Sequence, residues 1–141
     1  MKQNIRSGLF FLLITAWAIA SCSGKKESME HEGDWAEMDA YHMIMAESFH
    51  PLKDSSNLAP AKANAERMAA EAEKWAAADL PEKVSGDEMK AMIASLKASS
   101  RAFADQVEAG VADEELGIAL TKLHTEFHHI MEAWEGGHQH H

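Results

Sequence analysis

The residues of this chain with the clearest capacity for chemistry are its histidines and methionines. Nine histidines and nine methionines occur in 141 residues, and His124 and His128 are four positions apart in a stretch with helical periodicity. Because an α-helix completes a turn in about 3.6 residues, both imidazoles lie on one side of the helix and can reach the same ion. Imidazole nitrogen suits zinc, copper and nickel, whereas methionine sulfur favours Cu(I). The spacing therefore predicts a transition-metal site.

Further ligands for this ion are expected from a helix near the beginning of the domain. The first and last helices of an up-down bundle are antiparallel neighbours. If Trp35 and Trp134 lie at the same end, His42 on the first helix faces His128 on the fourth. The complete predicted set of metal ligands is His42, His124, His128, Met38, Met45 and Met131.

The same residues also have packing interpretations. His42 lies in an apolar stripe and can be a core histidine with a hydrogen-bond partner. Met45, which is expected opposite His124, can fill a gap in the core instead of binding metal. His50 suits a helix end, where its charge interacts with the helix dipole.

The remaining histidines are expected to contribute less to the site. His129 is turned by about 100° from His128 around the helix, so it faces solvent. Residues 136–141, Gly-Gly-His-Gln-His-His, form a histidine-rich tail. Such tracts gather metal weakly.

The candidate ligands are positioned by four predicted helices. Apolar residues recur every three or four positions from residue 34 to residue 135, and no stretch alternates as a strand would. The first helix is expected to end or kink near His50, the second to run from Asn57 to about Asp79, the third from Ser85 to Gly110, and the fourth from about Asp113 to Gly136. The inward faces are predicted to be Trp35, Met38, His42, Met45, Phe49 and Leu52; Leu58, Ala61, Ala65, Met68, Ala72 and Trp75; Met89, Ile93, Leu96, Ser100, Phe103 and Val107; and Leu116, Leu120, Leu123, Phe127, Ile130 and Trp134. The fold class is therefore all-α, an antiparallel up-down-up-down four-helix bundle.

The beginning of the chain is typical of a secretory signal. Lys2 and Arg6 precede an apolar run over residues 9–20, which is too short to span a bilayer comfortably. The run ends in Ile19-Ala20-Ser21-Cys22, which resembles the lipobox of bacterial lipoproteins. This resemblance implies that Cys22 is lipidated and that the chain is cut before it. The expected divisions are a signal peptide over 1–21, lipidated Cys22 and a tether over 22–33, the bundle over 34–135, and the tail over 136–141.

Composition limits the remaining functions. Cys22 is the only cysteine, so its lipidation excludes disulfides, thiol catalysis and cysteine-ligated metal. Removing residues 1–21 takes away two basic residues and no acidic ones, so the formal charge changes from −10 to −12. Such an acidic protein repels nucleic acid and anionic headgroups, and its membrane attachment is expected through the lipid anchor. Ser23 follows the cysteine, whereas lipoproteins that stay at the inner membrane of Gram-negative bacteria have an aspartate there. The resemblance therefore implies an outer-membrane location, facing the periplasm or the cell surface.

Parts of the helical region resemble the soluble periplasmic b-type cytochromes and the cytochrome c-prime family. The segments that carry the resemblance are Ser55-Ser56-Asn57-Leu58-Ala59-Pro60-Ala61-Lys62, Glu108-Ala109-Gly110 and Leu123-His124-Thr125-Glu126-Phe127-His128. The resemblance implies haem between the first and fourth helices, with axial ligands at His42 and at or near Met131. The chain lacks the Cys-x-x-Cys-His motif, so only noncovalent haem b fits the sequence.

Three functions follow from the sequence. The first hypothesis is an envelope lipoprotein whose bundle binds copper, zinc or nickel. The alternatives are a noncovalent haem b electron-transfer protein and a purely structural or partner-binding lipoprotein. An enzyme is not expected, because the sequence offers neither a nucleophile with its base nor a paired-carboxylate site.

Overall fold

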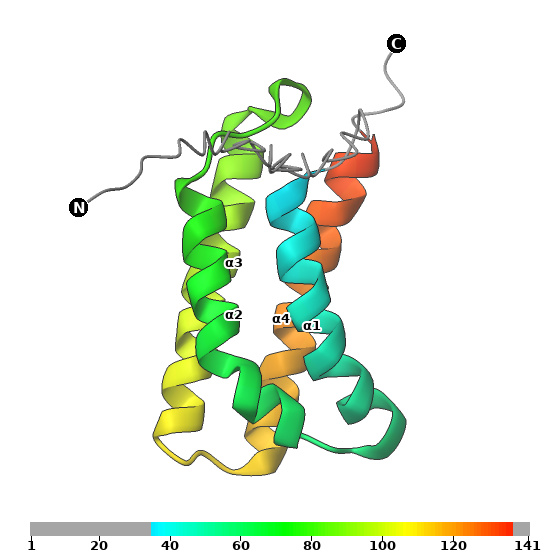
Figure 1. Ribbon diagram of the computed structural model, residues 1–141, viewed down its shortest axis with the longest axis vertical. Coiled ribbons are helices and arrows are strands. Elements are labelled where there is room, and N and C mark those ends of the chain that lie inside the picture. Colours follow the sequence, from blue (N-terminus) through cyan, green and yellow to red (C-terminus); the bar gives the residue numbers. More distant parts are fainter. Residues whose placement is uncertain (1–34, 137–141) are drawn as a thin grey trace, which may run out of the picture. The chain divides into compact units, whose positions relative to one another are not determined.

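The computed structural model describes residues 35–136, which form four α-helices and one short 3-10 helix (Figure 1). The helices are α1 (Ala36–Ser55), α2 (Ala59–Ala77), η1 (Glu82–Val84), α3 (Asp87–Glu108) and α4 (Asp113–Gly136). Each α-helix packs against the next one in the sequence, and α1 also packs against α4. No strand occurs in this range. The predicted all-α four-helix bundle is therefore confirmed.

The predicted inward faces of the last three α-helices form most of the core. Their apolar side chains are buried, apart from Val107, which is partly buried and packs against the core. In α2 four of the buried side chains are alanines. Alanine has high helix propensity, and its small side chain lets neighbouring helices approach closely.

Three tryptophans pack together at one end of the bundle. The ring centroid of Trp35 lies 5.1 Å from that of Trp75 and 5.2 Å from that of Trp134. Trp35 precedes α1, whereas the other two lie in the last turns of α2 and α4. The expectation that Trp35 and Trp134 lie at the same end is confirmed.

The predicted inward face of α1 is partly wrong. Met38 and Met45 are buried as expected, but His42 is exposed. The buried positions include Tyr41 and Ser48 instead. The helix is rotated relative to the prediction because these two polar residues find hydrogen-bond partners inside the bundle.

The central polar contact of the core joins α1 to α3. The hydroxyl of Tyr41 donates to Ser100 Oγ over 2.8 Å, and Ser100 Oγ in turn donates to the carbonyl oxygen of Leu96 over 2.7 Å. Both Tyr41 and Ser100 are fully buried. Burial raises the pKa of Tyr41 above its usual range, opposed by the hydrogen bond to Ser100. The phenol therefore stays neutral and acts as a donor.

Pro51 does not end α1 at His50. The helix continues through Pro51 to Ser55. Proline fixes φ near the helical value but has no backbone N–H, so α1 continues without the hydrogen bond that residue 51 would donate to the carbonyl of Glu47. The end comes at Ser56, whose φ of 53° lies in the left-handed region and whose N–H donates to Leu52 O.

Candidate metal centre

His124 and His128 form a close pair on α4. Their Nε2 atoms are 3.1 Å apart, so a hydrogen on one nitrogen can be donated to the other. The ring centroids are 4.4 Å apart. The predicted four-residue spacing thus brings the two nitrogens together on the outer side of the helix.

This separation suits a shared metal ion. Two imidazole nitrogens bound at about 2.0–2.1 Å to one tetrahedral or square-planar ion lie about 2.8–3.4 Å apart. The Nε2 atoms of His124 and His128 already fall in that range at 3.1 Å. A shared ion would lie to one side of the line between the two nitrogens, so each ring would turn to point its lone pair at the ion.

Phe49 on α1 fixes the orientation of His124. The two ring centroids are 3.7 Å apart and the ring planes are inclined by 14°, a stacked arrangement. Met45, expected opposite His124, is buried in the core, and the ring that stacks on His124 is that of Phe49. Stacking of this kind holds an imidazole in one rotamer.

Burial and nearby positive charges keep His124 neutral. Partial burial is the main cause that lowers the pKa of His124 from 6.5 to about 4, and charges on His128, His50 and Lys53 add to it. Only a neutral imidazole can coordinate metal. His124 therefore remains able to bind at mildly acidic pH, although the charge of Lys53 would also oppose a bound cation.

The structure places the other predicted α1 ligands partly as expected. His42 is exposed, and its ring centroid lies 5.6 Å from that of Phe127. Its charge is the smallest of the causes that lower the pKa of His124. Met38 and Met45 are 8% and 1% exposed, positions that suit the packing interpretation.

The remaining predicted residues lie on α4 or outside the described range. Met131 is half-buried against the core, and His129 is exposed as expected. Within residues 35–136 no three residues among His, Cys, Asp and Glu are grouped to hold an ion. Cys22, the tether and the tail histidines lie outside the described residues.

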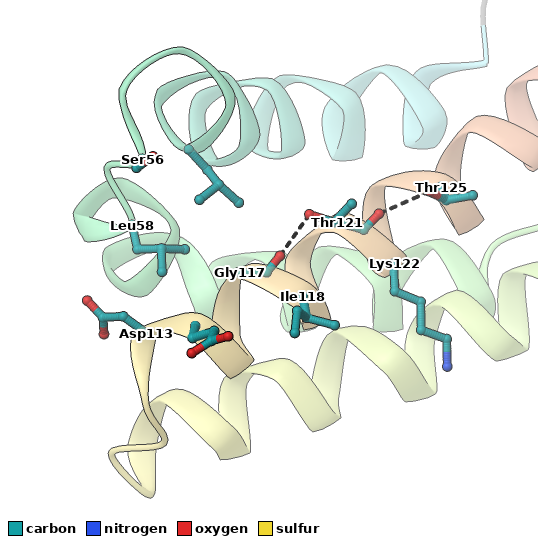
Figure 2. Close-up of a pocket in the computed structure, with 10 residues that line it drawn as sticks. Ser56, Leu58, Asp113, Gly117, Ile118, Thr121, Lys122 and Thr125 are labelled. Carbon is teal, nitrogen blue, oxygen red and sulfur yellow. Dashed lines mark hydrogen bonds between the residues drawn. The ribbon is translucent and has the colours of Figure 1, made fainter.

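A groove lies beside the histidine pair, where α4 meets the turn between α1 and α2. Its volume is about 670 Å³, and Leu52, Leu58 and Gly117 supply part of its apolar lining. Figure 2 shows Thr121 and Thr125 on the α4 side, each donating its hydroxyl to a backbone carbonyl one turn earlier. Thr125 follows His124 in the sequence, so one end of the groove comes close to the histidine pair. Sequence reasoning missed this groove, because it depends on how α1 ends.

The position that the cytochrome resemblance assigns to haem is occupied by packed aromatic rings. Between α1 and α4 the ring centroids of Tyr41 and Phe127 are 5.3 Å apart, and Tyr41 also lies 5.8 Å from Trp75. These rings would have to separate to admit a haem group between His42 and Met131. Axial ligation by this pair therefore does not fit the packed bundle.

No protein family, curated protein or solved structure matches this chain. Among residues 35–136, no helix has the length and apolar character needed to cross a membrane.

Proposed function

We propose that this protein is a lipid-anchored component of the bacterial envelope whose four-helix bundle binds a transition-metal ion, copper, zinc or nickel. The observation that carries this proposal is the 3.1 Å separation of the His124 and His128 Nε2 atoms. His42 is the proposed third ligand, since it lies on α1, which packs against α4, and its side chain is exposed. The role is binding rather than catalysis.

The proposal includes an antiparallel up-down-up-down order of the helices. Support comes from the contact of Trp35, at the start of α1, with tryptophans at the ends of α2 and α4. An ion pair of 2.5 Å between Lys62 and Asp113 also joins the first turns of α2 and α4. In this order α1 and α4 run side by side in opposite directions, which lets His42 approach the pair.

Metal titrations test the proposed site directly. In a chain whose tail histidines are replaced by asparagine, His124→Ala and His128→Ala should each weaken Zn²⁺, Cu²⁺ or Ni²⁺ binding by at least about tenfold in calorimetry, equivalent to about 1.4 kcal/mol. His129→Ala is the matched control, because it removes an adjacent exposed imidazole from the same helix. His42→Ala should also weaken binding, whereas Lys53→Gln should strengthen it by removing a nearby positive charge.

The same measurements can contradict the metal proposal. If His124 and His128 can be replaced without loss while removal of the tail histidines abolishes binding, the pair is a packing feature. A strong Soret band in protein purified from its native envelope would instead select noncovalent haem b. A protein that binds neither metal nor haem would favour the structural or partner-binding alternative.

The lipid anchor rests on the sequence around Cys22 and has its own test. Cys22→Ala should release the protein from the membrane fraction or block removal of residues 1–21, while the helical circular dichroism stays the same. Membrane fractionation and electrophoretic mobility that both match the wild type would contradict the anchor and, with it, the outer-membrane location.

A further inference from the structure

One face of α4 exposes a large apolar side chain next to the groove. Ile118 is 67% exposed, and among the described residues the other large exposed hydrophobic is Met43. Ile118 borders the groove together with Gly117, whose missing side chain leaves room beside it (Figure 2). A methyl group at Gly117 would meet Leu52 Cδ1 at 3.8 Å, so the nearest neighbour on this side of the groove is apolar.

Two opposite charges flank Ile118 symmetrically. Glu114 lies four residues before it and Lys122 four residues after it, and both line the same groove. Within the same helix these two residues are about 12 Å apart along the axis, too far to pair. Neither makes an ion pair in the described part of the chain, whereas neighbouring Asp113 pairs with Lys62.

From this arrangement we infer that the face defined by Glu114, Ile118 and Lys122 is a docking surface for a second copy of this chain. A two-fold axis next to Ile118 sets the two α4 helices antiparallel. Each Glu114 then lies level with Lys122 of the second copy, and the two Ile118 side chains meet at the centre beside the groove. The interface is isologous, with two charge pairs around one apolar contact.

Charge complementarity favours a second copy of this chain, with the two α4 helices antiparallel. A parallel pairing of the two helices in register would place Glu114 on Glu114 and Lys122 on Lys122, and like charges in an interface are costly. The antiparallel pairing converts both repulsions into attractions. Gly117 and Thr121 are small, so the helices can approach closely. The interface involves no histidine and is independent of metal binding.

Crosslinking of the full chain in the cells that produce it tests the inferred dimer. Ile118→Cys places a thiol next to the axis, so a short bismaleimide should yield a dimer of the chain on electrophoresis. Met43→Cys is the matched control, because Met43 is 61% exposed but lies on α1. The wild-type chain reports any crosslinking through Cys22.

Charge reversals then test the pairing. In the Ile118→Cys background, Glu114→Lys and Lys122→Glu should each reduce the dimer by about tenfold, because each creates two like-charge contacts. Co-production of the two reversed chains should restore a mixed dimer, and the double reversal in one chain should restore the symmetric one. Glu132→Lys, elsewhere on α4, should have no effect.

Several results would overturn the inference. These are a dimer yield at Ile118→Cys no higher than at Met43→Cys, insensitivity to the single reversals, or failure of the combined reversals to restore the dimer. Crosslinking of Ile118→Cys to a different protein would assign the face to another partner and equally reject the second copy. Because Glu114, Ile118 and Lys122 are exposed, each variant is expected to retain the wild-type circular dichroism.

Discussion

The ring of Phe49 on α1 lies parallel to the ring of His124 on α4, with 3.7 Å between the centroids and 14° between the planes. This contact covers one face of the imidazole and removes water from it. It also leaves Nε2 directed at His128. The packing of an apolar ring therefore links the stability of the α1–α4 contact to the protonation of a candidate metal ligand.

The first prediction is that Phe49 helps to set the pKa of His124. Phe49→Ala exposes the imidazole to water, so the pKa of His124 should rise from about 4 toward its ordinary value of 6.5. NMR titration of the histidine ring protons measures the change. Met43→Ala, which alters an exposed residue on the same helix, should leave the titration unchanged. A His124 pKa that remains near 4 in Phe49→Ala would show that the stacked ring is not a source of the burial effect.

The second prediction concerns the pH dependence of stability. Because the pKa of His124 is lower in the folded chain than its ordinary 6.5, the unfolded chain binds more protons between these values. The contribution of His124 to stability is complete above pH 6.5 and is lost as the pH falls toward 4. On acidification from pH 7 to pH 4.5, the melting temperature of the wild type should therefore fall further than that of His124→Gln. His129→Gln should show no such shift, and a parallel decline of all three proteins would contradict the prediction.

The rotation of α1 shows which parts of the bundle the sequence could predict. The inward faces of α2, α3 and α4 consist mainly of apolar residues and small residues, so helical periodicity identified them. On α1 the polar residues Tyr41 and Ser48 are buried because their partners come from other helices. Ser48 Oγ accepts from Asn64 Nδ2 on α2 over 3.3 Å. Periodicity within one helix contains no information on such partners.

The same limit applies to the candidate site. The spacing of His124 and His128 predicted their proximity, because both lie on one helix with fixed geometry. The stack on Phe49 depends on the rotation of α1, and the groove depends on the continuation of α1 through Pro51. Both features require the arrangement of separate helices, so local sequence patterns could not specify them.

The last prediction concerns the hydrogen bond between Tyr41 and Ser100 in the core. Tyr41→Phe removes the donor, but Ser100 Oγ keeps its own bond to Leu96 O, so the expected loss in free energy of unfolding is about 1 kcal/mol. Ser100→Ala leaves the buried phenol without an acceptor and should cost about 1–3 kcal/mol. The double variant should lose less than the sum of the two single losses, because no unpaired hydroxyl remains.

Urea unfolding of the four proteins measures these differences. Ser95→Ala is the control, because Ser95 is an exposed serine on α3, the helix of Ser100. It should change stability by less than about 0.5 kcal/mol. A larger loss in Tyr41→Phe than in Ser100→Ala would contradict the asymmetry, and strictly additive losses would show that the two hydroxyls contribute independently. The predicted result would show that the two buried hydroxyls are energetically coupled across the contact between α1, which carries Phe49 and His42, and α3.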